Sequence, residues 1–321
     1  MKILLTGASG QVGGRLLPLL LAAGHDVAAP SRAELELADP PAVRHAVSAI
    51  SPRLVINAAA WTDVEAAETD PRAMEINAVA PGVLAAAAAR AGAALIHFST
   101  DYVHDGTARH PYGESDPASP LNAYGRGKLA GDLAVLASGA PALILRLSWV
   151  YDSTGRNFLL KIISLLRQRD TLQVVNDQRG APTPAGVIAN AVAAIIAKSD
   201  RDPAALFRRA GGVVNLACRG GTTWHGFAQE IAALARAAGC DARASRIDPI
   251  TAAEYRGRVR RPLNSRMRLG ELKRRFGLAP PHWRTALRQL FASDAAVIVG
   301  TKEAAIAPAT AHPREMHVTP V

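Results

Sequence analysis

Cysteine and aromatic residues are scarce in this chain. Only Cys218 and Cys240 occur among 321 residues, without C-x-x-C spacing, so neither a disulfide framework nor a structural zinc site is indicated. We expect two reduced thiols. Aromatics make up 5% of the residues, and the densest basic stretch, residues 256–275, contains none. Because strips that bind nucleic acid interleave stacking rings with basic residues, this stretch does not predict such a partner.

Long apolar runs are also missing. The most membrane-like window, residues 79–96, is rich in alanine and is broken by Pro81, Gly82, Arg90 and Gly92. The N-terminal apolar run, residues 3–5, is too short for a signal peptide. We therefore expect neither a membrane span nor an export signal, and a cytoplasmic location.

The composition is that of a soluble globular protein, with 49% hydrophobic and 20% charged residues. A length of 321 residues allows two domains. The net charge of +10 is scattered along the chain, which favours pockets for phosphorylated small molecules over an extended anionic partner.

Short aliphatic runs alternate with helical segments in the first half, which predicts an α/β fold with a doubly wound, Rossmann-like parallel sheet. The expected strands are residues 3–5, 26–29, 54–58, 95–99 and 142–149, and the expected helices are residues 12–23, 42–50, 81–91 and 124–137. Pro18 conflicts locally with the first helix.

The alternation loosens after residue 151. We assign residues 1–150 to a nucleotide-binding domain and residues 151–293 to a smaller lobe, with a possible return of the chain to the sheet. Residues 213–217, 224–238 and 282–290 are expected as elements of that lobe. From residue 294 to 321 no period is visible, and we expect a flexible tail.

A glycine motif directly follows the first expected strand. Gly7, Gly10 and Gly13 enclose Gln11 and Val12 in the spacing G-x-x-G-x-x-G and open the first helix. Glycines at this position let the backbone approach a pyrophosphate, which the helix N-terminus then binds. We expect Gly7, Gly10, Gln11 and Val12 to contact a dinucleotide.

The end of the second expected strand indicates which dinucleotide binds. Ser31 and Arg32 stand where sites specific for NAD have an acid, and a hydroxyl with a guanidinium suits a 2′-phosphate. Glu34 and Glu36 lie nearby and could serve a ribose or the adenine. This pattern favours NADPH.

Tyr124 and Lys128 form a Y-x-x-x-K pair, on one face of an expected helix. Reduction of a ketone needs a proton donor at the oxygen, and a nearby ammonium would lower the pKa of the tyrosine below its usual value of about 10. Lys128 would also hold the nicotinamide ribose. Taken alone, such a pair is common in helices, and its weight comes from the glycine motif and from residues 99–101.

These features resemble short-chain dehydrogenase/reductases of the extended type, and more closely the dTDP-4-dehydrorhamnose reductase family. The resemblance runs in order from residue 1 to about 290. It is carried by residues 99–103 (STDYV), 105–106 (DG), 112–114 (YGE), 120–125 (PLNAYG), 128–131 (KLAG), Arg146 with 148–151 (SWVY), Gly155 with 157–158 (NF), 177–178 (DQ) with Gly180, 182–183 (PT), and 261–262 (RP) with 264–265 (NS).

The resemblance implies NADPH-dependent reduction of the 4-keto group of dTDP-4-dehydro-L-rhamnose to dTDP-L-rhamnose. It implies a catalytic set of Thr100, Tyr124 and Lys128. The nicotinamide side would be lined by Ala58, Ala59 and Ala60 after the third strand. The sugar nucleotide would be bound by Thr100, Asp101, Tyr102 and Trp149, with Arg261 on the diphosphate.

This chain departs from the family pattern at three positions. His104 replaces an aromatic residue and Leu147 replaces a common threonine. Arg15 stands where some members have an acid that binds a metal at a dimer interface, so we carry over neither the metal nor that dimer, although a homodimer stays possible.

Two alternatives remain. A sugar-nucleotide epimerase or 4,6-dehydratase would share most of these motifs, but dehydratases have glutamate after the Thr-Asp pair, where this chain has Tyr102. A regulatory subunit resembling that of methionine adenosyltransferase would act by binding alone. The intact Thr100, Tyr124 and Lys128 set favours a reductase.

Overall fold

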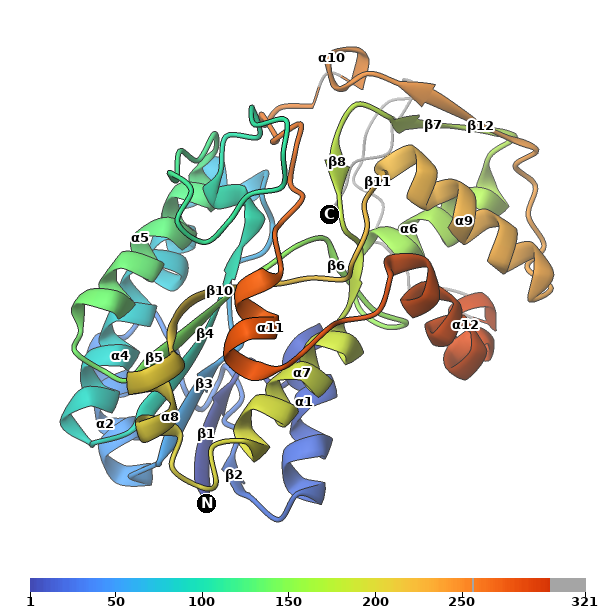
Figure 1. Ribbon diagram of the computed structural model, residues 1–321. Helices are drawn as coiled ribbons and strands as arrows, with labels where there is room; N and C mark the ends of the chain where they lie inside the picture. The colour runs from blue at the N-terminus through green and yellow to red at the C-terminus, as the bar shows by residue number, and fades with distance from the viewer. Residues whose placement is uncertain (256, 301–321) are drawn as a thin grey trace.

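The computed structural model describes residues 1–255 and 257–300. A parallel sheet of six strands, in the order β10-β5-β4-β3-β1-β2, forms the larger half (Figure 1). Its strands are β1 (Lys2–Thr6), β2 (Asp26–Ala28), β3 (Leu54–Asn57), β4 (Ala94–Thr100), β5 (Ala142–Leu147) and β10 (Gly212–Leu216). The predicted α/β fold with a doubly wound parallel sheet is confirmed.

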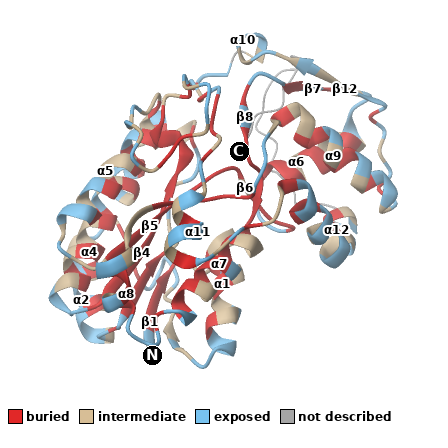
Figure 2. Ribbon diagram, viewed as in Figure 1, coloured by how far each residue is buried: buried red, intermediate tan, exposed pale blue. Residues whose placement is uncertain are grey.

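Helices cover both faces of this sheet. Helices α1 (Gln11–Ala22) and α7 (Ala185–Ala197) pack together on one face, and α2 (Pro40–Ile50), α4 (Ala80–Arg90) and α5 (Ala123–Ala137) on the other (Figure 1). Ile3 and Leu5 join one apolar cluster, whereas Leu4 joins the cluster across the sheet. Successive side chains alternate between two buried faces, so the strands are continuously apolar and appear buried in Figure 2. Helix α1 runs through Pro18 without a break.

The smaller half is built from helices and short strand pairs around its own core. Its helices are α6 (Phe158–Gln168), α9 (Trp224–Ala237), α10 (Ala252–Tyr255) and α12 (Trp283–Gly300). Its strand pairs are β7 (Thr171–Val175) with β12 (Arg246–Ile250), β8 (Arg179–Gly180) with β11 (Thr222–Thr223), and β6 (Val150–Tyr151) with β9 (Thr183–Pro184). Rings of Trp149, Trp224, Phe158, Phe227 and Trp283 fill this core.

After residue 151 the chain returns to the sheet. Besides α7, the helices α8 (Pro203–Ala210) and α11 (Gly270–Phe276) pack against its strands. The assignment of residues 213–217 to the smaller lobe is wrong, since β10 pairs in parallel with β5 along the sheet edge. In that position the backbone of β10 pairs with β5, and its apolar side chains pack into the cores on the two faces of the sheet.

The tail prediction is also wrong for residues 294–300, which continue α12 beyond a kink at Asp294. Ile298 is fully buried, and Asp294 accepts hydrogen bonds from Arg15 and Ser153. A period was not visible because the kink interrupts the helix. The rest of the predicted tail, residues 301–321, lies outside the described part of the chain.

The short helix α3 (Arg72–Met74) leads through a π-helical turn, residues 75–79, into α4. Two 3₁₀ turns, residues 66–68 and 101–103, lie above the carboxyl edge of the sheet. No helix among residues 1–255 and 257–300 is long and apolar enough to cross a membrane.

Candidate active site

The glycine motif forms a tight turn between β1 and α1. Gly7 has a φ of +71°, and the Gly10 N–H donates to its carbonyl at 3.0 Å. An added Cβ at Gly13 would lie 2.1 Å from the Gly7 carbonyl oxygen, so only glycine fits there. No side chain caps the start of α1 and no acid lies in its first turn, which leaves its N–H groups available to an anion. This geometry fits a dinucleotide pyrophosphate.

The other predicted cofactor contacts surround this turn. An added Cβ at Gly7 would meet the backbone of Ala58 and Ala59, so the loop after β3 lies directly against the motif. Gln11 bonds across to the smaller half, donating to the Arg156 carbonyl at 3.4 Å. The Arg32 side chain is 69% exposed and lies 3.5 Å from the Glu36 carboxylate.

Tyr124 and Lys128 occupy consecutive turns of α5, and Thr100 ends β4. Asn122 caps α5 by accepting from the Gly125 N–H at 2.8 Å. At Gly125 an added Cβ would lie 2.3 Å from the Tyr102 carbonyl oxygen, so glycine lets α5 approach the end of β4. The three predicted catalytic residues therefore meet at the carboxyl edge of the sheet, where α/β proteins bind their ligands.

The expected lowering of the Tyr124 pKa is wrong. Burial raises the pKa of Tyr124, and the interaction with Thr100 only partly opposes the rise. The Lys128 ammonium does not act on the phenol in this arrangement, because its Nζ lies 2.5 Å from the Phe98 carbonyl oxygen and 3.3 Å from His97 Nε2. Tyr124 is therefore a protonated phenol at neutral pH.

Lys128 is 2% exposed, and burial lowers its pKa to about 8, with Asp132 opposing the change. Around it lies a group of buried polar side chains beneath the site. Asn57 Nδ2 is 3.2 Å from His97 Nδ1, and the Ser99 hydroxyl donates to Asp132 at 2.7 Å. The sequence motifs gave no role to His97.

Asp101 is turned inward. Its carboxylate accepts hydrogen bonds from Thr100 at 3.0 Å and Ser148 at 2.8 Å, and burial raises its pKa to about 6. Tyr102 is also buried, with its ring edge-to-face against Tyr124 at a centroid distance of 5.8 Å. Both residues thus border the predicted catalytic residues, and Asp101 accepts the Thr100 hydroxyl proton.

Arg261 lies near these rings with a side chain that is only 6% exposed, 3.6 Å from the Glu65 carboxylate. Burial, together with the charge of Arg261, lowers the pKa of Lys161 to about 8. Sequence reasoning missed Lys161, although a lone charge inside the apolar run of residues 158–166 is a visible signal. Two cations thus gather between the halves of the molecule.

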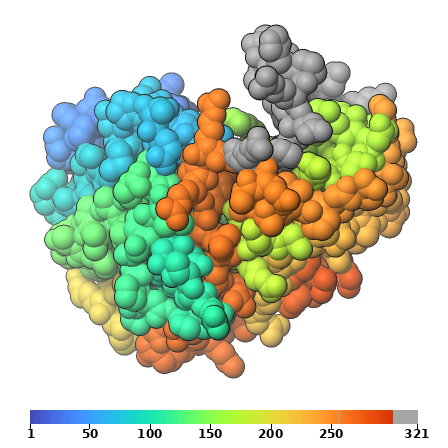
Figure 3. Space-filling model, turned by 90° about the horizontal axis from the view of Figure 1, so that it is seen from above, coloured from blue at the N-terminus to red at the C-terminus, as the bar shows by residue number. Residues whose placement is uncertain are grey.

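A hollow of about 430 Å³ opens beside Arg261. Its lining includes Arg260, Arg261, Tyr255, Gln178, Asp177 and Leu263. Figure 3 shows the segment that carries the arginines, in orange, running between the larger half, in blue to green, and the smaller half.

Trp149 is not brought into this group. Its ring stacks on Trp224 at a centroid distance of 3.4 Å and is 9% exposed, within the core of the smaller half. The backbone there has a φ of +46°, unusual for a residue with a side chain. Contact with a sugar would have to use an edge of this ring.

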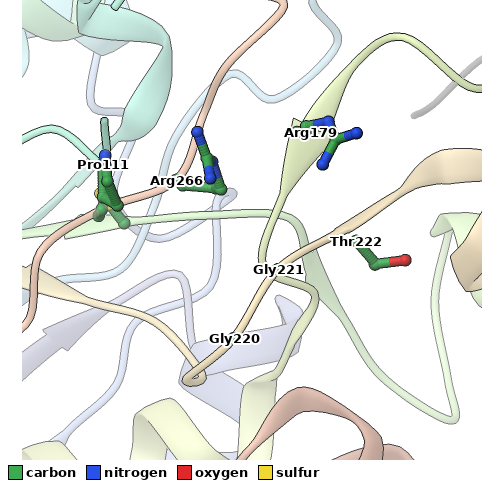
Figure 4. Close-up of a pocket in the computed structure, with 7 residues that line it drawn as sticks. Pro111, Arg179, Gly220, Gly221, Thr222 and Arg266 are labelled. Atoms are coloured by element: carbon green, nitrogen blue, oxygen red, sulfur yellow. The ribbon is translucent and has the colours of Figure 1, made fainter. Parts of the chain in front are cut away.

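A second hollow of about 370 Å³ lies away from the catalytic group, between β8, β11 and the segment before α11 (Figure 4). Arg179 and Arg266 face it beside the Gly220–Gly221 turn. Arg266 is held by the Asn264 side chain and the Arg109 carbonyl.

Arg15 binds acids rather than leaving room for a metal. Its guanidinium pairs with both oxygens of Asp152 and with Asp294, each at 2.7 Å, and bonds Ser153. In residues 1–255 and 257–300, no group of three or more His, Cys, Asp or Glu residues is arranged to hold a metal ion. Cys218 and Cys240 are buried free thiols.

Comparisons with known proteins agree with this geometry. The family model described as "RmlD substrate binding domain" matches residues 1–295. A dTDP-4-dehydrorhamnose reductase from Burkholderia thailandensis is 44% identical over 290 residues, 89% of this chain and 97% of that protein. The corresponding reductase of Salmonella typhimurium is 36% identical over 294 residues, 90% of this chain and 97% of that protein.

Solved structures show the same likeness. A dTDP-4-dehydrorhamnose reductase from Clostridium acetobutylicum superposes with a TM-score of 0.83 at 33% identity, covering 91% of this chain and 99% of that one. The Bacillus anthracis enzyme, solved in complex with NADP, gives a TM-score of 0.81 at 29% identity with the same coverage.

Fold and site together define an oxidoreductase built on a Rossmann-like domain. Within that class, this chain belongs to the RmlD substrate binding domain family, and it is similar to the dTDP-4-dehydrorhamnose reductases described above. The resemblance found in the motifs is thereby confirmed.

Proposed function

We propose that this chain uses NADPH to reduce the 4-keto group of dTDP-4-dehydro-β-L-rhamnose, giving dTDP-L-rhamnose. Residues 1–150 would provide the dinucleotide site and the catalytic residues, and most of residues 151–293 the sugar-nucleotide lobe. The observation that carries the proposal is the meeting of Thr100, Tyr124 and Lys128 at the same sheet edge as the glycine turn.

Bound NADPH would supply the hydride to the carbonyl carbon. Tyr124 would donate its phenolic proton to the oxygen, and the raised pKa keeps that proton in place until the oxygen becomes basic. Thr100 would hold the same oxygen, while Lys128 would bind the ribose. Asp101 accepts the single Thr100 proton in the free protein, so this hydroxyl would turn from Asp101 to the sugar oxygen when the substrate binds.

Positive charge favours a sugar nucleotide beside Arg261 and Lys161, between the two halves of the molecule. The positive charge of Arg261 lies close enough to Lys161 to lower its pKa, which means that the two cations repel each other. A bound diphosphate would relieve this repulsion. The predicted sugar contacts, Asp101, Tyr102 and Trp149, stay predictions, and the Tyr102 ring packs edge-to-face against Tyr124.

The test is NADPH oxidation with dTDP-4-dehydrorhamnose made freshly by the preceding enzymes. We expect turnover, with dTDP-L-rhamnose as the product. A matched reaction with a dTDP-4-keto sugar of different stereochemistry at C3 and C5 should be slower. Absence of turnover with both sugars, under conditions where NADPH binds, would favour the regulatory-subunit alternative. Conversion of a dTDP-sugar without net NADPH consumption would favour an epimerase or dehydratase.

A further inference from the structure

His97 is the least accessible polar group near the site and has no place in the proposed chemistry. It lies in the middle of β4, is 0% exposed and is surrounded by other buried polar residues. Burying an imidazole between two apolar layers is costly unless both ring nitrogens find partners. Here each nitrogen has one, Asn57 at Nδ1 and Lys128 at Nε2.

The surroundings of Lys128 match the needs of an ammonium, which has three N–H donors and no acceptor. The Phe98 carbonyl lies 2.5 Å from Nζ and His97 Nε2 lies 3.3 Å from it. Two N–H donors of the ammonium are therefore used by residues of β4, which leaves the third N–H for a bound ligand. The ammonium is fixed in position before a ligand arrives.

This arrangement dictates the state of the imidazole. Nε2 accepts from an ammonium only when it carries no proton, so the ring is neutral and protonated on Nδ1. Burial and the charge of Lys128 both lower the His97 pKa well below its usual value, which also favours the neutral ring.

A proton on Nδ1 needs an acceptor, and Asn57 supplies one only when its amide is turned over, because Nδ2 is the atom that faces Nδ1 in the structure. The Asn57 amide spans His97 Nδ1, 3.2 Å from Nδ2, and the Thr6 hydroxyl, 2.7 Å from Oδ1. A half-turn of the amide brings its oxygen to Nδ1, and Thr6 serves equally as acceptor or donor. The chain of bonds thus starts at Thr6, directly before the glycine turn, and ends at Lys128.

Other charged groups are near. From α5, Asp132 Oδ1 lies 3.8 Å from His97 Nε2, and Tyr124 lies one turn before Lys128. From β5, Arg146 Nε lies 3.8 Å from Asp132 Oδ2. Asp132 raises the Lys128 pKa through its charge, while His97 is the neutral side chain 3.3 Å from the ammonium.

We propose that His97 is a positioning residue, which accepts a hydrogen bond from Lys128 through Nε2 and is oriented by Asn57 and Thr6. It touches neither substrate nor cofactor. It acts by fixing the position of the Lys128 ammonium, so that this group can bind the ribose of the cofactor. The inference therefore rests on the proposed function.

The first test uses substitution in the full-length enzyme. His97→Leu removes the acceptor, and His97→Gln returns a carbonyl to about the same place. The matched control is Asn215→Leu, because Asn215 is also a fully buried polar residue in a strand of the same sheet. We follow kcat against pH, the KM for the sugar nucleotide, the Kd for NADPH and the Tm.

For His97→Leu we expect kcat to fall about tenfold with KM for the sugar nucleotide nearly unchanged. Loss of an acceptor from the charged form lowers the lysine pKa, so the alkaline limb of kcat should move about one unit below its position near pH 8. His97→Gln should return the alkaline limb of kcat to its wild-type position. Asn215→Leu should lower Tm but leave the alkaline limb where it is in the wild type. A limb that stays in place in His97→Leu overturns the proposal.

The second test needs no destabilising variant. In ¹⁵N-histidine-labelled enzyme, the His97 signals, assigned by their loss in His97→Gln, should show a neutral ring protonated on Nδ1 at neutral pH. A ring protonated on Nε2, or on both nitrogens, overturns the proposal.

Parallel Tyr124→Phe and Lys128→Met variants separate the two claims. If both keep normal turnover, the proposed catalytic roles fail, whatever His97 does. If both lose turnover while His97→Leu behaves like Asn215→Leu, only the role of His97 fails.

Discussion

The two halves of the molecule hold their cores together in different ways. In the larger half, a continuous parallel sheet is buried on both faces, and its strands contribute residues to two apolar layers. In the smaller half, strands of two to five residues pair only in twos, and stacked rings such as Trp149 with Trp224 fill the centre. The first half is organised by backbone pairing and the second by contacts between distant side chains.

This difference explains where the proposed catalytic residues lie. A rigid sheet edge holds Thr100 and, through α5, the Tyr124 and Lys128 pair within a fixed frame. The smaller half contributes the charged groups Arg261 and Lys161 from separate segments. The proposed chemistry would thus depend on the sheet, and the proposed recognition of the sugar nucleotide on how the smaller half is assembled.

The largest expected effect is on catalysis. Tyr124→Phe removes only a hydroxyl, so kcat should fall by about two to four orders of magnitude while the NADPH Kd stays nearly constant. Steady-state turnover and a fluorescence titration with NADPH measure the two quantities. Near-normal turnover would remove Tyr124 from the role of proton donor.

A pair of glycine substitutions compares the halves directly. Gly13→Ala places a Cβ 2.1 Å from a backbone oxygen, and Gly180→Ala places one 2.2 Å from the Trp149 ring. Because a backbone turn has no room to move, we expect Gly13→Ala to abolish detectable NADPH binding. Gly180→Ala should instead displace the ring and lower Tm by several degrees, with NADPH binding kept.

Gly186→Ala is the control for this pair, since nothing lies within 4 Å of its added Cβ and it sits in α7. It should leave NADPH binding intact and add about 0.5–1 kcal/mol to the free energy of unfolding. If Gly13→Ala binds NADPH like Gly186→Ala, the glycine turn does not hold the cofactor.

A third prediction concerns the ion network that joins the halves. Although burial opposes it, hydrogen bonds from Ser153 and Arg15 lower the pKa of Asp294 below its usual value. A carboxylate with a lowered folded-state pKa stabilises the protein above its unfolded-state pKa, and this contribution is lost as pH falls through the folded-state value.

Asp294→Asn should therefore lower the free energy of unfolding by about 1–2 kcal/mol at neutral pH, and this difference should shrink below about pH 4. Denaturant unfolding at several pH values measures it. Asp248→Asn, on a surface pair with Arg246, is the matched control and should have little effect. Equal behaviour of the two variants would mean that α12 is not fastened through Asp294.

The sequence predicted most of the larger half well, because the sequence patterns that indicate its strands, helices and turns are local. The apolar runs became β1, β3, β4 and β5, and the glycine spacing and the Tyr124 to Lys128 spacing lie as expected. It failed where a property depends on distant residues. The apolar run at 213–217 could not reveal that β5 offers a free edge, nor could residues 294–300 reveal their partners Arg15 and Ser153.

The site shows the same limit. The sign of the Tyr124 pKa shift depends on how deeply the ring is buried and on where the Lys128 ammonium points, and neither follows from their spacing in the chain. The strand predicted to end at Trp149 ends at Leu147, and Trp224, more than seventy residues later in the chain, covers the face of the Trp149 ring.

The smallest expected effect concerns the choice of cofactor. The Arg32 side chain is 69% exposed and lies 3.5 Å from the Glu36 carboxylate, so its bond to a 2′-phosphate would remain open to solvent. Arg32→Asp should lower the ratio of kcat/KM for NADPH to that for NADH by about tenfold, which corresponds to about 1.4 kcal/mol. The control is Arg44→Asp, a charge reversal at an exposed position of α2, which should leave the ratio unchanged. If wild-type enzyme already uses NADH as well as NADPH, the residues at the end of β2 do not select the cofactor. The preference would then have to come from elsewhere along the adenosine site.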